Sequence, residues 1–477
     1  MIRDLQIHSK RDGRYLTGAN LLRPKTQIYG SILVCVIIGI LWHILAHPLF
    51  IIMLSLIPIG ILFVLGYNFL MVLLFVIFSF FRIHEAFPML YSLKIPLLLS
   101  LASIFSLAWH VAISQKIKVY WTKELTVISL FFLLVVIGVF MASNRPVALH
   151  YFKGVYWKII IMLFAIAWLT RTPKDFSFAA KIITVSGCLV AAVAISNKLQ
   201  GIGLVEGTRV TIGRHIGSVL GDPNDLALVL MFPTAFAVSL LVTRGVSRSS
   251  HLLGLVGVSL LFFATIATQS RGGLLGVLAV FAVFGIKKIK SKVLLLSIGC
   301  ILALSLFAFA GISDRQSGGS AEAGIDASAQ GRLYAWEAAA GMAMDNPLTG
   351  VGIDNFFSNY YYYSKHWDGL NHAVHSTWFG VLAETGVLGL IVFITMITLL
   401  IKASARSVRA IDRQALSEAS IDPSMQACSQ AIFAGLIGTI VSGTFLTHGF
   451  TWPIYILAGL VVAISHWTEK HCYRQSD

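Results

Sequence analysis

Long apolar stretches recur along the whole chain, and they constrain its fold more than any other sequence feature. They run to about 16–24 residues, close to the roughly 20 that an α-helix needs to cross a bilayer. Of 477 residues, 57% are hydrophobic and 12% charged, against about 25% charged in soluble chains. These values exclude a soluble enzyme, a disordered chain and a disulfide-stapled secreted domain, and ten-residue alternating segments typical of a β-barrel are absent. The sequence predicts an all-α polytopic membrane protein.

The apolar runs predict about 12–14 transmembrane helices, because the short turns leave the count in the N-terminal half open. The predicted ranges are 28–45, 49–65, 67–81, 93–113, 125–142, 154–170, 180–196, 225–243, 252–267, 273–286, 293–312, 378–401, 430–446 and 452–467.

The distribution of basic residues predicts the orientation. The formal net charge is +15, and no nucleic-acid-binding motif accompanies it, so no nucleic-acid partner is expected. With the N-terminus inside, 24 of the 36 Lys and Arg residues fall in inner segments and 12 in outer ones. We therefore expect a cytoplasmic N-terminal tail over 1–27, a single membrane domain over 28–467 and a cytoplasmic C-terminal tail over 468–477.

Two outer segments, 197–224 and 313–377, are long, and long loops in compact domains are usually functional. The first presents Arg209 and Arg214, which the positive-inside bias disfavours there, so we interpret the pair as an anion site. Its GDPND turn predicts that Asn224 or Asp225 caps the next helix.

Arg271 lies in the run TQSRGGLLG, so close to two apolar stretches that its guanidinium must lie near the bilayer surface. Snorkelling to lipid phosphate is one explanation, and a substrate role is the other. Gly272 and Gly273 would allow another backbone or a substrate to come close.

The 313–377 loop divides into parts. Residues 316–331 are small and polar and predict a flexible segment. A short helix follows, on which Leu333, Trp336, Ala340 and Met344 form one apolar stripe suited to the outer membrane surface. Arg332 at its start is unfavourable for the helix dipole, which suggests an anionic partner. A turn over 346–352 and an aromatic run over 356–367 come next; the latter indicates an interface belt or a surface that stacks on sugars or an isoprenoid chain.

Two histidines follow, His372 and His375, whose spacing of three predicts a shared helix face. A zinc site would need further ligands, and no HExxH pattern is present, so we expect no metal.

From these residues the chain resembles the O-antigen ligase and polymerase superfamily, the Wzy-C proteins of bacterial surface-glycan assembly. The pair His375-Ser376, nine residues, Gly386, two residues and Gly389 match the ligase pattern, although Leu390 and Ile391 replace the two threonines of some ligases. GDPNDLA at 221–227, SRGG at 270–273 and NPLTGVGIDNF at 346–356 support it. The resemblance covers about residues 205–392.

This resemblance implies a GT-C-type glycosyltransferase of the bacterial inner membrane with a periplasmic active site. It would move an oligo- or polysaccharide from undecaprenyl diphosphate to an acceptor hydroxyl on a glycan, glycolipid or protein, without metal, nucleotide sugar or other cofactor. His375 would be the general base, and the diphosphate would be held by Arg209, Arg214, Arg271 and Arg332. His372, Asp354 and Glu384 are supporting candidates, the two acids as nucleophiles for a double displacement.

Chemistry supports this assignment independently. A lipid diphosphate is already a good leaving group, so the reaction needs charge neutralisation, which arginine provides in pairs of hydrogen bonds. The acceptor hydroxyl needs a base, and imidazole has a suitable pKa.

Other functions remain open at this point. An O-antigen or exopolysaccharide polymerase and a protein O-oligosaccharyltransferase differ from a ligase only in the acceptor. A transporter or flippase usually places ionisable groups at the midplane and carries repeated halves, which this sequence lacks.

Overall fold

The computed structural model describes residues 48–309, 327–416 and 421–473, and scattered positions between 29 and 40. Five predictions therefore lie wholly or partly outside the described residues. They are the N-terminal tail over 1–27, most of the helix over 28–45, the end of the helix over 293–312, the start of the long loop and the end of the C-terminal tail.

The described residues fold almost entirely into α-helices and contain no β-strand, which confirms the predicted all-α membrane class. Among them, eight helices are long and apolar enough to cross a membrane, or up to nine if the bent pair α3–α4 counts as one span. The helices are α3 Pro48–Gly66, α4 Asn68–Phe80, α5 Ile83–Ala86, α6 Ile95–Ala108, α7 Lys123–Met141, α8 Arg145–Tyr151, α9 Trp157–Leu169, α10 Pro173–Gln200, α11 Pro223–Val242, α12 Arg248–Thr268, α13 Arg271–Lys288, α14 Lys292–Phe309, α15 Ala327–Asp345, α16 Phe356–Tyr363, α17 Thr377–Leu416, α18 Pro423–Gly443 and α19 Trp452–Thr468.

Polar caps explain where the helix boundaries differ from the apolar pattern. Helix α10 begins at Pro173, seven residues before the predicted start at 180, because Thr172 and Asp175 form a capping box. The Thr172 hydroxyl accepts from the Asp175 amide at 3.2 Å, and the Asp175 carboxylate accepts from the Thr172 amide at 2.8 Å.

The chain divides into two compact units, residues 1–75 with 97–120, and residues 76–96 with 121–477. In the first unit, a π-helical turn follows α6, and its His110 ring contacts the carbonyl oxygen of Leu65 at 2.9 Å. Every candidate site residue predicted from the sequence belongs to the second unit.

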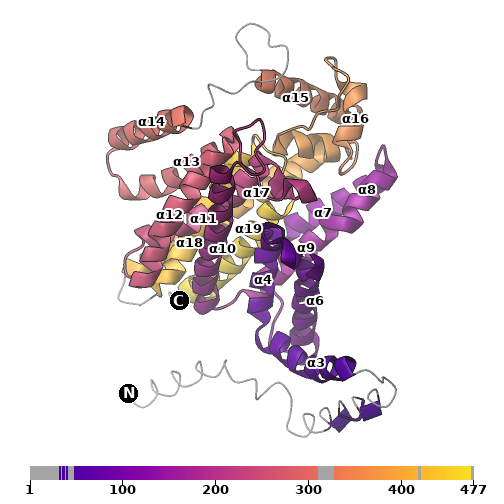
Figure 1. Cartoon of the computed structure of the whole chain (residues 1–477), viewed down its shortest axis with the longest axis vertical. Coiled ribbons are helices and arrows are strands. Elements are labelled where there is room, and N and C mark those ends of the chain that lie inside the picture. Colours follow the sequence, from indigo (N-terminus) through magenta and orange to yellow (C-terminus); the bar gives the residue numbers. More distant parts are fainter. Residues whose placement is uncertain are drawn as a thin grey trace. The chain divides into compact units, whose positions relative to one another are not determined.

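In the second unit, α11 is the central helix, packed against α10, α12, α13 and α18 (Figure 1). Glycines allow these neighbours to come close: a Cβ on Gly254 of α12 would lie 2.6 Å from the Leu241 amide nitrogen. A Cβ on Gly187 of α10 would lie 2.4 Å from the Pro233 side chain. Such close approach is typical of helix packing in membranes. No hydrophobic effect drives helices together in lipid, so they associate by close packing, which small residues allow.

Helices α15 and α16 lie together at the end of this bundle where α17 begins (Figure 1). Two predictions for this loop are wrong. Residues 327–331 are helical rather than flexible, so Arg332 is the sixth residue of α15 and not its first. The buried face of α15 is also not the predicted stripe, since Leu333 and Met344 are exposed; it is formed by Ala335, Ala338, Ala339 and Met342. Small side chains let α15 pack directly on α17.

Helix α17 is broken at Gly386, whose φ of 71° and ψ of −174° are not helical. This φ lies in the region that essentially only glycine adopts. A Cβ at this position would lie 2.4 Å from the carbonyl oxygen of Pro347, and that oxygen accepts a hydrogen bond from the Val387 amide at 2.8 Å. The break therefore holds the 346–352 turn against α17.

Candidate functional site

The first turn of α11 carries the GDPND motif, and its cap differs from the prediction. Asp222, rather than Asn224 or Asp225, is the N-cap residue: its carboxylate accepts from the amides of Asn224 at 2.7 Å and Asp225 at 3.3 Å. Pro223 occupies the first helical position, where no amide is needed. An N-cap side chain reaches the second and third residues after it, so Asp222 is the only motif residue placed to serve both.

Asn224 instead joins the GDPND motif to the SRGG motif. Its side-chain oxygen accepts from Arg209 at 3.0 Å and from the Ser270 hydroxyl at 2.9 Å. Arg209 is 4% exposed, and its Nε donates to the Thr268 carbonyl at 3.2 Å. The predicted diphosphate arginine is therefore inside the protein, where it links the 205–210 strand-like turn, α11 and the end of α12.

The SRGG motif forms the first turn of α13. Ser270 is its N-cap and accepts from the Gly273 amide at 3.3 Å, and Arg271 is the first helical residue. A Cβ on Gly273 would lie 2.4 Å from the Cβ of Ala227, so the predicted close approach is to another helix. Arg271 is half-buried, and it directly follows Ser270, which contacts Asn224 in the first turn of α11.

The loop that joins α18 to α19, residues 444–451, connects the first turns of α13 and α17. The Thr377 hydroxyl donates to the Leu446 carbonyl at 2.7 Å and accepts from the His448 amide at 3.0 Å. A Cβ on Gly272 would lie 3.3 Å from the Cβ of Phe445. Three long helices, α11, α13 and α17, therefore begin around one loop. Helix N-termini carry a partial positive charge and present free amides, which favours an anion.

His375 lies immediately before the first turn of α17 and is half-buried. Its φ of 46° is left-handed, a strained conformation that is common at functional sites. Burial lowers the pKa of His375, the positive charges of Arg332, His372 and Arg209 lower it further, and Asp222 opposes them. Arg332, Asp222 and Arg209 lie far apart in the sequence, and each acts electrostatically on His375.

The predicted shared helix face of His372 and His375 is wrong, because residues 371–376 form an irregular segment. His372 is directed to the exposed carboxylate of Asp368, 3.0 Å from its Nε2. The described residues contain no cluster of three His, Cys, Asp or Glu side chains arranged for a metal ion.

Arg214 is exposed in the same loop as Asp222. Its Nη1 donates to the Gly221 carbonyl at 3.4 Å. The loop is held by Ser218, whose hydroxyl donates to the buried carboxylate of Glu85, and Glu85 also pairs with Arg82. The loop that carries Arg214 is therefore fixed to the segment before α6.

Of the supporting acids, Asp354 lies two residues before α16, and Glu384 lies in α17 beside the start of α16. Glu384 accepts from the Phe356 amide at 3.3 Å. Asp354 has a φ of 62°; burial raises its pKa, and His150 opposes that effect. Both carboxylates thus lie where α8, α16 and α17 meet.

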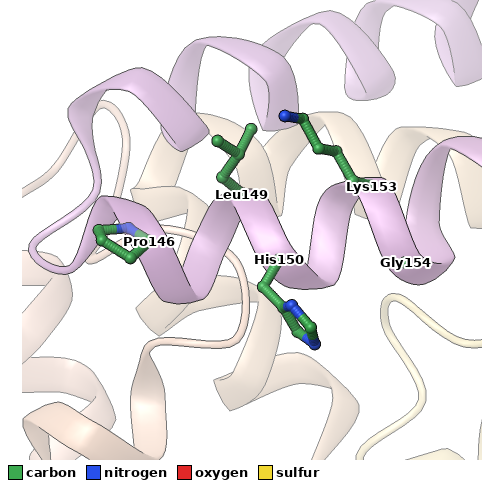
Figure 2. A pocket seen from close by; sticks show the side chains of 5 residues that line it. All are labelled: Pro146, Leu149, His150, Lys153 and Gly154. Carbon is green, nitrogen blue, oxygen red and sulfur yellow. The ribbon is translucent and has the colours of Figure 1, made fainter.

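An open hollow of about 440 Å³ lies on α8 and the π-helical turn that follows it, lined by Pro146, Leu149, His150, Lys153 and Gly154 (Figure 2). His150 and Lys153 point to opposite sides of the helix in this view. None of the arginines or histidines predicted for the reaction lines this hollow, so the candidate site is the region around His375.

Sequence reasoning gave three residues of this region no role in the site. Asp222 and Asp225 belong to a helix-capping motif, and His448 stands alone in a short connection. His448 is 5% exposed, and its Nε2 is 3.6 Å from the Asp225 carboxylate. The only signal for His448 was a histidine between two apolar runs, which is too common to indicate a site.

Residues 256–394 match the family described as O-Antigen ligase, Wzy_C. This confirms the resemblance drawn from the His375 and glycine motif. The matched segment contains Arg271, Arg332 and His375, whereas Arg209 and Arg214 precede it. No curated protein matches the chain.

Proposed function

We propose that this multi-pass membrane protein, with its O-antigen ligase domain over residues 256–394, is a glycosyltransferase with a lipid-linked donor. The donor is an oligo- or polysaccharide on undecaprenyl diphosphate, and the acceptor is a hydroxyl at the periplasmic face of the bacterial inner membrane. The architecture is of the GT-C type, with both termini in the cytoplasm.

One observation carries this proposal: the first turns of α11, α13 and α17 all contact the 444–451 loop, His375 directly precedes α17, and Arg271 begins α13. Amides at helix N-termini and guanidinium groups are the protein's best ligands for phosphate oxygens. Arg271 and Arg332 hold the diphosphate together with Arg214 at the rim. Arg209 contributes its charge from inside the network.

His375 acts as the base. The acceptor oxygen attacks the anomeric carbon while its proton passes to a ring nitrogen of His375. The bond from that carbon to the diphosphate oxygen breaks, and undecaprenyl diphosphate leaves with the electron pair. Such base catalysis is worth typically 10²–10⁴-fold. Direct attack inverts the anomeric centre.

The test is purified protein with a lipid-linked glycan and separate candidate acceptors, followed by sizing of the products. One addition to lipid A core supports the ligase, one addition to protein indicates an O-oligosaccharyltransferase, and a ladder of repeat units indicates a polymerase. No transfer to any acceptor, with the protein folded in the detergent used, contradicts the proposal.

Replacing Arg271 with lysine tests the diphosphate site. We expect Arg271→Lys to lower kcat/KM by about tenfold, because lysine keeps the charge but loses the planar fork that grips two phosphate oxygens. The matched control is Lys287→Arg at the other end of α13, where the lysine pairs with Asp412 at 2.8 Å, and it should transfer at the wild-type rate. Full activity of Arg271→Lys would indicate that this arginine only reaches for lipid headgroups.

The pH dependence of kcat/KM tests the base. His375 must be neutral to accept a proton, so transfer falls as the pH drops through its pKa. Because burial and Arg332 lower this pKa below its usual 6.5, the acidic limb should lie below pH 6.5. Arg332→Gln should move that limb to higher pH, since a cation is removed. Asp222→Asn keeps a good helix cap and should move it to lower pH. An acidic limb at the same pH in all three proteins would argue against His375 as the titrating group.

A further inference from the structure

His448 is a buried histidine with one nitrogen that has no hydrogen-bond partner among the described residues. Its Nδ1 lies 3.0 Å from the Thr451 hydroxyl in the same loop. Its Nε2, 3.6 Å from the Asp225 carboxylate, is too distant for a hydrogen bond and makes no other. A buried polar atom left without a partner is costly, so its place beside a carboxylate calls for an explanation.

The ring of His448 is neutral under ordinary conditions. Burial lowers the pKa of His448 to about 4, and the negative charge of Asp222 opposes that effect. A neutral ring carries one N–H and one lone pair. With the proton on Nε2, the ring presents its N–H toward the Asp225 carboxyl group, 3.6 Å away, while Nδ1 lies within hydrogen-bond distance of the Thr451 hydroxyl.

The backbone of the same residue reaches the other side of the site. The His448 amide donates to the Thr377 hydroxyl at 3.0 Å, and Thr377 is the first residue of α17, two positions after His375. Asp225, in contrast, lies in the first turn of α11, three positions after Asp222. His448 therefore connects the first turn of α17, which follows His375, to the first turn of α11, which lies beside Arg209 and Arg271.

We propose that His448 and Asp225 are positioning residues for glycan transfer: the imidazole holds the first turn of α11 at a set distance from that of α17. This inference rests on the proposed function. It assigns neither residue a contact with substrate. The separation between the arginines and His375 decides whether the base meets the acceptor hydroxyl when the diphosphate is bound, and a displacement of about 1 Å can cost up to about 10²-fold in rate.

A pair of isosteric replacements separates this role from simple packing of the loop. The amide nitrogen of glutamine reaches the place of Nε2, so His448→Gln keeps a donor toward Asp225 and loses the Thr451 contact. Asparagine reaches only the place of Nδ1, so His448→Asn keeps the Thr451 contact and loses Asp225. The donor KM and kcat are measured with purified protein and a lipid-linked glycan.

We expect His448→Gln to keep kcat within about threefold of wild type, and His448→Asn to lose about tenfold in kcat with the donor KM unchanged. The acidic limb of the pH profile should stay in place in both, because it belongs to His375. The reverse order of the two kcat values, or equal values, overturns the positioning role.

Hydrogen exchange of the peptide over 371–380 gives a readout that needs no activity. Exchange should be faster than wild type in His448→Asn and unchanged in His448→Gln; the reverse overturns the inference. If wild-type protein transfers no glycan, the proposed function fails, whereas wild-type transfer with equal Gln and Asn rates removes only the positioning role. Should neither variant accumulate, Asp225→Ala, which removes the acceptor, tests the pair from its other side: a threefold to tenfold lower kcat is expected, and wild-type kcat overturns it.

Discussion

Replacement of His375 by alanine or asparagine is expected to reduce glycan transfer by at least about 10²-fold, because the acceptor hydroxyl then has no base. Asparagine is the more informative change. It tolerates the left-handed backbone that His375 adopts at a φ of 46°, so the chain should keep its shape while the ring is lost. Transfer is measured as product formed per folded protein, with abundance determined in the same membranes.

His366→Ala is the matched control. His366 belongs to the same loop, is exposed and stacks on Tyr334 with ring centroids 3.8 Å apart. It should transfer at close to the wild-type rate. If His375→Asn accumulates and transfers normally, residue 375 is not the base and the mechanism proposed above is wrong.

Replacement of Gly386 by valine is expected to remove most folded protein from the membrane. The residue has a φ of 71° and a ψ of −174°, a conformation in which a β-branched side chain is strained by roughly 1–3 kcal/mol. A Cβ would also lie 2.4 Å from the Pro347 carbonyl oxygen, a distance that no real contact shows. The turn over 346–352 must then leave α17. Fluorescence-detected size exclusion of a tagged protein measures the folded fraction.

Gly299→Ala is the control for a glycine change in a helix. Gly299 lies in α14, with open space where a Cβ would be added. Its replacement should leave the folded fraction unchanged or slightly higher, because alanine favours a helix over glycine. A normal folded fraction and normal transfer for Gly386→Val would mean that the break in α17 is not required.

The glycine motif illustrates what a sequence pattern means physically. Gly386 was recognised only as part of a family signature, with no reason for its position. In the structure it is the point where α17 breaks, and Gly389, one turn later, leaves no room for a Cβ beside Thr385. The motif thus fixes the 346–352 turn to α17, the helix that follows His375, through backbone geometry.

The sequence predicted the site less completely than it predicted the fold. Residue type and location in outer segments indicated His375 and the arginines, and their roles remain proposals. The pairing of His372 with His375 failed, because spacing predicts a helix face only where a helix exists. The cap of α11 was assigned to the wrong residue, because several members of GDPND have capping side chains and only the backbone decides which one reaches the free amides.

By itself, the sequence determined the membrane class and the approximate helix ranges, because hydrophobic length acts locally, and residue type suggested the site that remains a proposal. Only the tertiary structure decided that three helix N-termini meet around the 444–451 loop, and that His448 faces Asp225. These contacts join residues from 69 positions apart, for Thr377 and Leu446, to 223 positions apart, for Asp225 and His448. No local pattern encodes them, since they depend on how the helices pack.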